Sequence, residues 1–89
     1  MKTKQFLSEA IRLSGTDRQK DYGDKTKNHN NIARLWSAYL DIKIEAHDVA
    51  IMMSLLKIAR TKLGKVCKDT YIDMSAYSAI AGEIKWRKK

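Results

Sequence analysis

Apolar positions recur along the chain with the three- and four-residue spacing of amphipathic helices. Four segments carry this pattern, namely residues 4–14, 28–40, 45–63 and 69–85. The chain contains no proline, so long helices can run without interruption. The connection after residue 40 is short, which is typical of antiparallel neighbours. We therefore predict an all-α fold, a four-helix antiparallel bundle formed as one domain by residues 1–89.

The segment 45–63 is apolar around nearly two thirds of its circumference. A helix of this kind is expected to lie at the centre of the molecule, covered either by its own chain or by another subunit. Eighty-nine residues bury only about 60 to 65% of the surface of the unfolded chain. A shared core would add stability, so we expect a homo-oligomer.

Residues 16–31, TDRQKDYGDKTKNHNN, form a polar stretch between the first two helices. Cations for phosphate, a ring for base stacking and a glycine for close backbone approach together suit a nucleotide. The polar groups at the start of the second helix also favour anions. A solvated turn with its tyrosine packed on the core is the alternative. The predicted ligand-binding residues are Arg18, Lys20, Tyr22, Gly23, Asp24, Lys25, Asn28, His29 and Arg60.

Charge points to the same class of partner. Lysine and arginine number 18 against 10 acidic residues, a net charge of +8. Such a surface attracts nucleic acid, nucleotides or acidic membrane, unless it serves only as a solvated face. We find no signal peptide and no apolar stretch long enough to span a membrane. Cys67 is the single cysteine, which fits a reducing cytosol.

Three aspartates form a candidate metal site. Asp69 and Asp73 are four residues apart and share a helix face, and Asp48 opens the central helix. If these carboxylates converge, they could hold Mg²⁺ together with waters and substrate phosphates. The alternative is structural: aspartates at helix starts cap backbone N–H groups, and Arg60 could pair with an inward aspartate.

Several motifs resemble a known family. DRQKDYGD (17–24), NHNNIARLWSAYL (28–40), DVAIMMSLLKIAR (48–60) and DTYIDMSAYSAIA (69–81) look like a family of small uncharacterised phage and prophage domains, over residues 6–83. This resemblance implies a location in the cytoplasm of an infected bacterium. The DYGD element followed by core helices and a late Asp-rich helix is also similar to MazG-like all-α nucleotide pyrophosphohydrolases. The E-E-x-x-E and E-x-x-D pairs of that group are absent, which favours nucleotide binding without turnover.

These observations lead us to expect a protein that holds a phosphorylated ligand, either a nucleotide or a cyclic or signalling nucleotide. The phage resemblance suggests that such a protein sequesters a messenger of host defence. A Mg²⁺-dependent nucleotide pyrophosphohydrolase and a nucleic-acid-binding protein are the alternatives. No cofactor is certain, and the sequence does not identify the ligand.

Overall fold

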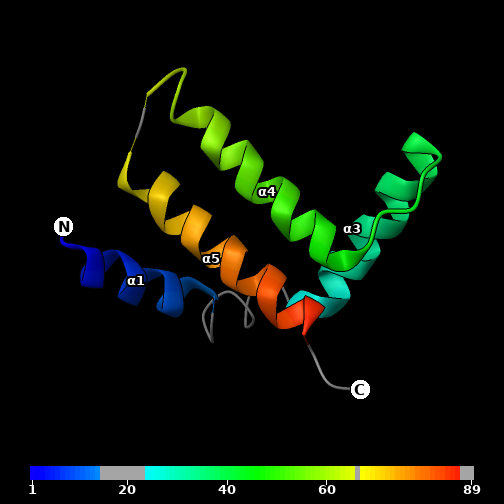
Figure 1. Cartoon of the computed structure of the whole chain (residues 1–89), viewed down its shortest axis with the longest axis horizontal. Coiled ribbons are helices and arrows are strands. Elements are labelled where there is room, and N and C mark those ends of the chain that lie inside the picture. The colour runs from blue at the N-terminus through cyan, green and yellow to red at the C-terminus, as the bar shows by residue number, and fades with distance from the viewer. Residues whose placement is uncertain (15–23, 66, 87–89) are drawn as a thin grey trace.

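The computed structural model describes residues 1–14, 24–65 and 67–86. Within these ranges the chain forms four helices and no strand, so the predicted all-α fold is confirmed (Figure 1). The helices are α1 (Thr3–Arg12), α3 (Lys25–Leu40), α4 (Ala46–Arg60) and α5 (Lys68–Lys85). None of these described helices is long and apolar enough to cross a membrane.

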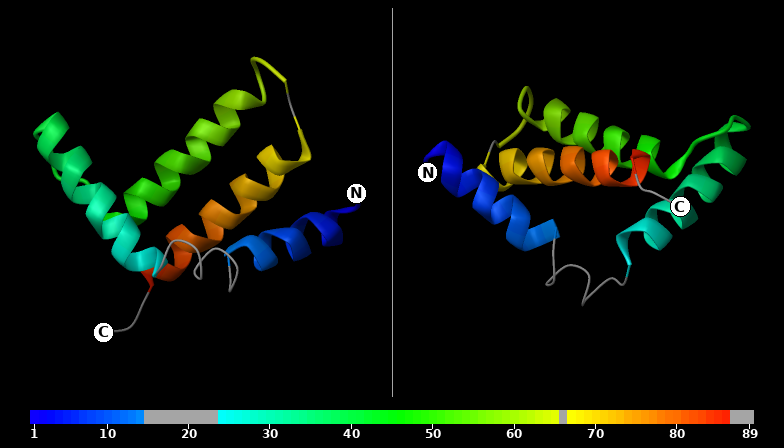
Figure 2. Two further views of the ribbon diagram at one scale, coloured as in Figure 1. Left: turned by 180° about the vertical axis from the view of Figure 1, so that it is seen from behind. Right: turned by 60° about the horizontal axis from the view of Figure 1, so that its bottom comes forward.

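The centre of the molecule is the antiparallel pair of α4 and α5, which lie side by side in all views (Figures 1 and 2). Val49 and Ala50 of α4 are fully buried, and Ala50 packs in one cluster with Ile80 and Ala81 of α5. The alanines carry only a methyl group, so the two helix backbones can approach closely. This contact is the most extensive between any two of the described helices.

Helix α1 packs on the outer side of α5. Ala10 is buried against Ile72 and Ala76, and the ring of Phe6 meets that of Tyr71 edge to face, with 6.5 Å between ring centroids. Since Phe6 precedes Ala10 just as Tyr71 precedes Ala76, α1 runs in the same direction as α5 (Figure 1). The predicted antiparallel arrangement therefore describes α4 and α5, while α1 departs from it.

Helix α3 crosses the end of the α4–α5 pair and then diverges from it (Figure 2). Lys25 at its start forms an ion pair with Glu83 near the end of α5, at 3.3 Å. At its other end, the Ser37 hydroxyl accepts a hydrogen bond from the Ile44 N–H at 2.8 Å and lies 3.2 Å from the Ile44 carbonyl. These bonds fix the short connection between α3 and α4.

The side of α4 that faces away from α5 is apolar and exposed. The sequence predicts that this helix is covered either by its own chain or by another subunit, and the single chain covers only one side. The radius of gyration of 13.7 Å exceeds the roughly 12 Å typical of a compact chain of this length. The exposed apolar side chains of α4 are Ile51, Met52, Leu55, Leu56 and Ile58.

The close contact between α4 and α5 leads to a prediction. Replacing Ala50, which is fully buried, with leucine should lower the free energy of unfolding by about 1–3 kcal/mol, because the added atoms force the helices apart. Urea denaturation followed by circular dichroism measures this change. Ala79→Leu on the exposed side of α5 is the matched control and should change stability by less than about 0.5 kcal/mol. Equal losses in both variants would contradict the packing described here.

Candidate functional site

The connection between α4 and α5 gathers positive charge. Helix α4 ends at Arg60 because Thr61 turns back on the helix: its backbone N–H and its hydroxyl both donate to the Ile58 carbonyl, at 3.0 and 2.7 Å. The predicted end near Leu63 therefore lies three residues too late. Gly64 adopts a φ of +84° within the turn, a conformation that glycine reaches without strain.

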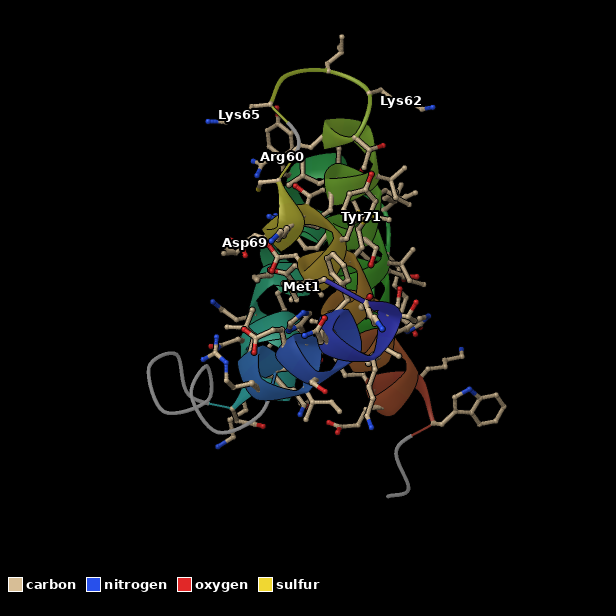
Figure 3. The ribbon with its side chains drawn as sticks, turned by 90° about the vertical axis from the view of Figure 1, so that its left-hand side faces the viewer. Met1, Arg60, Lys62, Lys65, Asp69 and Tyr71 are labelled. Atoms are coloured by element: carbon tan, nitrogen blue, oxygen red, sulfur yellow. The ribbon has the colours of Figure 1, made fainter. Side chains whose placement is uncertain are left out.

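The cations of this connection lie on two sides of the molecule. Arg60 and Lys65 project to the same side as Asp69, and Lys62 projects to the opposite side (Figure 3). Lys68 is the first residue of α5 and is exposed, as are the others. Across the described residues, none of these four cations forms an ion pair. We call Arg60, Lys65 and Lys68 the turn cluster.

Cys67 precedes the first turn of α5 and has an unusual environment for an exposed thiol. The Thr70 hydroxyl lies 3.7 Å from the Cys67 sulfur, and a hydrogen bond from this side chain is the main cause that lowers the thiol pKa. The Thr70 backbone N–H lowers the pKa further, whereas partial desolvation opposes the shift. The lowered pKa of Cys67 therefore comes from hydrogen bonding to Thr70 and not from the positive charge of the adjacent lysines.

The three aspartates predicted to hold a metal ion are not brought together. In an antiparallel pair the starts of the two helices lie at opposite ends, so Asp48 is separated from Asp69 by roughly 18 Å of helix. The Asp48 carboxylate accepts a hydrogen bond from the Glu45 N–H at 3.0 Å, which makes it a helix cap. Asp69 is exposed in the first turn of α5. In the described ranges, no group of three or more potential ligands is placed to bind a metal ion.

Asp73 has a different partner from the one expected. Its carboxylate pairs with the Lys57 ammonium at 3.2 Å across the contact between α4 and α5, and both side chains are less than one fifth exposed. Arg60, which the sequence suggested as partner of an inward aspartate, is exposed. The pair therefore joins α4 to α5 and engages Asp73 in a structural contact.

Most of the predicted ligand-binding loop is not described. Arg18, Lys20, Tyr22 and Gly23 lie outside the described residues. Asp24 is the N-cap of α3, since its carboxylate accepts a hydrogen bond from the Lys27 N–H at 3.3 Å. That cap explains why α3 begins three residues before the predicted start at residue 28.

The other predicted loop residues lie within the first turns of α3. Lys25 is engaged with Glu83, and the Asn28 side chain is exposed. His29 is buried, and its Nδ1–H donates to the Lys25 carbonyl at 2.7 Å. Its Nε2 atom is buried without a hydrogen-bond partner among the described residues. Because Glu83 is near the end of α5 and the turn cluster is at its start, these residues lie roughly 20 Å from the turn cluster. Within one chain they therefore cannot share a site with Arg60.

Sequence reasoning noted that the connection is basic but did not assign Lys65 and Lys68 to a site. It also assigned no partner to Lys57, because spacing alone did not show that this lysine lies on the side of α4 facing α5. No sequence signal identified Thr70 as the partner of Cys67.

The environment of Cys67 predicts a pH dependence. Because the folded-state pKa is lowered, the thiolate persists to lower pH, and alkylation by iodoacetamide should reach half its maximal rate below the midpoint of a free thiol. Thr70→Val removes the main hydrogen bond and should raise this midpoint, whereas Thr70→Ser should preserve it. A midpoint that is identical in all three proteins would contradict this role of Thr70.

The Lys57–Asp73 pair predicts a stability difference. Lys57→Met leaves a largely buried carboxylate without its partner and should cost about 2 kcal/mol in urea unfolding. The double variant Lys57→Met/Asp73→Leu should recover most of that loss. Lys43→Met, which removes an exposed pair with Glu45, serves as the control and should cost at most about 0.5 kcal/mol. If Lys57→Met cost no more than Lys43→Met, the pair would contribute little.

Comparison with known proteins identifies relatives in phages. The "Gene 55 protein" of Mycobacterium phage L5 is 40% identical over 76 residues, which cover 84% of this chain and 49% of that protein. The "Gene 55 protein" of Mycobacterium phage D29 is 40% identical over 79 residues, or 89% of this chain and 52% of that protein. The chain thus spans about half the length of these curated relatives, and no solved structure matches it.

The predicted resemblance to small phage domains is supported by this result. The pattern of one family, described as a domain of unknown function (DUF6378), matches residues 5–85. This match covers nearly the whole chain, including α3, α4, α5 and all but the first two residues of α1. The chain therefore belongs to the DUF6378 family.

Proposed function

We propose that this protein binds a phosphorylated small molecule, a nucleotide or a signalling nucleotide, through the turn cluster. The observation that carries the proposal is the arrangement of Arg60 at the end of α4, Lys65 in the connection and Lys68 at the start of α5, with Asp69 as the adjacent carboxylate. None of the three cations is neutralised by an ion pair within the described ranges. Positive charge of this kind is available to an external anion.

The chemistry of the turn cluster suits phosphate. The Arg60 guanidinium can offer two parallel N–H donors to two phosphate oxygens, while the lysine ammonium groups act as mobile point charges. The connection leads directly into the first turn of α5, whose backbone N–H groups add positive potential. A ligand with two or more phosphate charges would gain most from this arrangement.

The polar segment that contains Tyr22 remains part of the proposal as a base-stacking element. We expect a nucleotide as the ligand on the resemblance of the DYGD element in the sequence to MazG-like proteins. Asp24, Lys25 and His29 hold the described end of this segment to α3 and α5. Within one chain the start of α3 lies far from the turn cluster. A pocket lined by both would therefore have to form between two subunits.

Binding without turnover is favoured over metal-dependent hydrolysis by the engagement of the carboxylates. Asp48 caps α4 and Asp73 pairs with Lys57, so two of the three candidate ligands already have structural partners. Sequestration of a host messenger in the cytoplasm of an infected bacterium is the role that fits such a binding protein. Nucleic-acid binding is the competing function, because a basic surface attracts any polyphosphate.

A thermal-shift screen tests the proposal. Purified protein is heated with mono-, di- and cyclic nucleotides, with inorganic phosphate and with a single-stranded oligonucleotide, each with and without Mg²⁺. A nucleotide at a hundredfold excess over its Kd should raise the Tm by on the order of 10 °C and be recovered intact. A shift that requires Mg²⁺ and is accompanied by cleavage would support the enzyme instead.

Matched variants locate the binding site. Arg60→Gln combined with Lys65→Gln should abolish the shift, whereas Lys4→Gln combined with Arg34→Gln removes the same charge from exposed positions of α1 and α3 and should preserve it. Equal weakening in both variants, with a steep loss of binding in salt, would indicate non-specific attraction of nucleic acid. No shift with any compound would refute the proposal.

A further inference from the structure

The outer side of α4, which faces away from α5, is apolar although water surrounds it. Ile51, Met52, Leu55 and Ile58 remain 46%, 37%, 56% and 43% exposed. Single exposed apolar residues are common on protein surfaces, but a contiguous apolar patch marks a contact with another molecule. We call these four residues the outer face of α4.

The spacing of the outer face is that of a helix which packs against another helix. Leu55 lies at its middle, and Ile51, Met52 and Ile58 lie one turn before or after it. Steps of three and four residues keep these side chains on one side of the helix. The opposite side carries Val49, Ala50 and Ser54, which are buried, and Ala50 packs against Ile80 and Ala81 of α5. One helix thus has two packing faces, of which the chain fills one.

The ends of the outer face carry opposite charges. Asp48 lies seven residues before Leu55, and Lys62 lies seven residues after it. Seven residues are almost two full helical turns, so Asp48 lies on the same side of the helix as Leu55. Lys62 lies in the turn just after the end of the helix, where its N–H donates to the Ala59 carbonyl at 3.1 Å. Asp48 is partly exposed, and Lys62 projects away from Arg60 and Lys65 (Figure 3). The outer face is therefore acidic at one end and basic at the other.

This pattern is complementary to itself. If a second copy of α4 lies antiparallel, with the two-fold axis at Leu55, each residue meets the one that is equally far from Leu55 on the other side. Leu55 then meets its own counterpart, Met52 meets Ile58, and Asp48 meets Lys62. A two-fold interface requires such self-complementarity, because the same surface serves both copies. A parallel pairing would instead place like charges together.

We propose that a second copy of this chain covers the outer face of α4, antiparallel and with its two-fold axis at Leu55. The proposal does not depend on ligand binding, because Lys62 points away from the turn cluster. It has one consequence for the proposed function. The start of α3 lies near the start of α4, so the partner's α3 begins at the same end of the dimer as the turn cluster.

Disulfide cross-linking tests the register. In a Cys67→Ser background, which removes the native exposed thiol, Leu55→Cys should form a disulfide-linked dimer in high yield under mild oxidation. Ile58→Cys alone should not, because its counterpart is Met52. Mixing Ile58→Cys protein with Met52→Cys protein should restore the cross-link. Efficient self-cross-linking of Ile58→Cys would overturn the antiparallel register.

Sedimentation of the unmodified chain tests the interface itself. The chain should sediment as a dimer at micromolar concentration. Leu55→Asp should raise the dimer Kd by on the order of a hundredfold or more, because the two-fold axis brings the introduced carboxylates of the two copies together. Ile11→Asp on α1 is the matched control, because Ile11 is as apolar and is 72% exposed, and it should leave the Kd unchanged. Circular dichroism verifies that both variants remain helical. A chain that stays monomeric at 100 μM, or one that Ile11→Asp dissociates equally, would refute the proposal.

Discussion

The close packing of α4 against α5 is the constraint on which the rest of the structure depends. Alanines at the contact bring the helices together, and the Lys57–Asp73 pair joins them within a mainly apolar interface. Such a pair is tolerated there because each charge neutralises the other, and removal of either one leaves an unpaired charge. The remaining helices attach to this pair, α1 through α5 and α3 through α4, so their positions follow from its geometry.

Much of the fold could be predicted from the sequence. Apolar spacing located the four helices, and the errors at their ends arise from hydrogen bonds that spacing does not encode, such as the Asp24 cap and the return of Thr61 onto Ile58. The direction of α1 could not be predicted, because a long polar segment permits either orientation. Nor could the covered side of α4 be predicted, since apolar positions around nearly two thirds of the helix do not show which side its own chain covers.

The candidate site was harder to predict than the fold. Asp48 and Asp69 both open helices, and in sequence this made them look equivalent, yet the starts of antiparallel neighbours lie at opposite ends. The same geometry separates His29 from Arg60. Lys65 and Lys68 gain significance only in three dimensions, where Arg60 and Lys65 project to one side and Lys62 to the other. Spacing identifies which residues share a helix face, whereas connectivity decides which of them meet.

The attachment of α1 to α5 and of α3 to α4 also has a dynamic consequence. Helix α1 packs on α5, whereas α3 packs on α4 and is also joined to α5 by the Lys25–Glu83 ion pair. Fewer contacts hold these outer helices than hold α4 against α5, so local unfolding is expected to begin in α1 or α3 while the central pair stays intact.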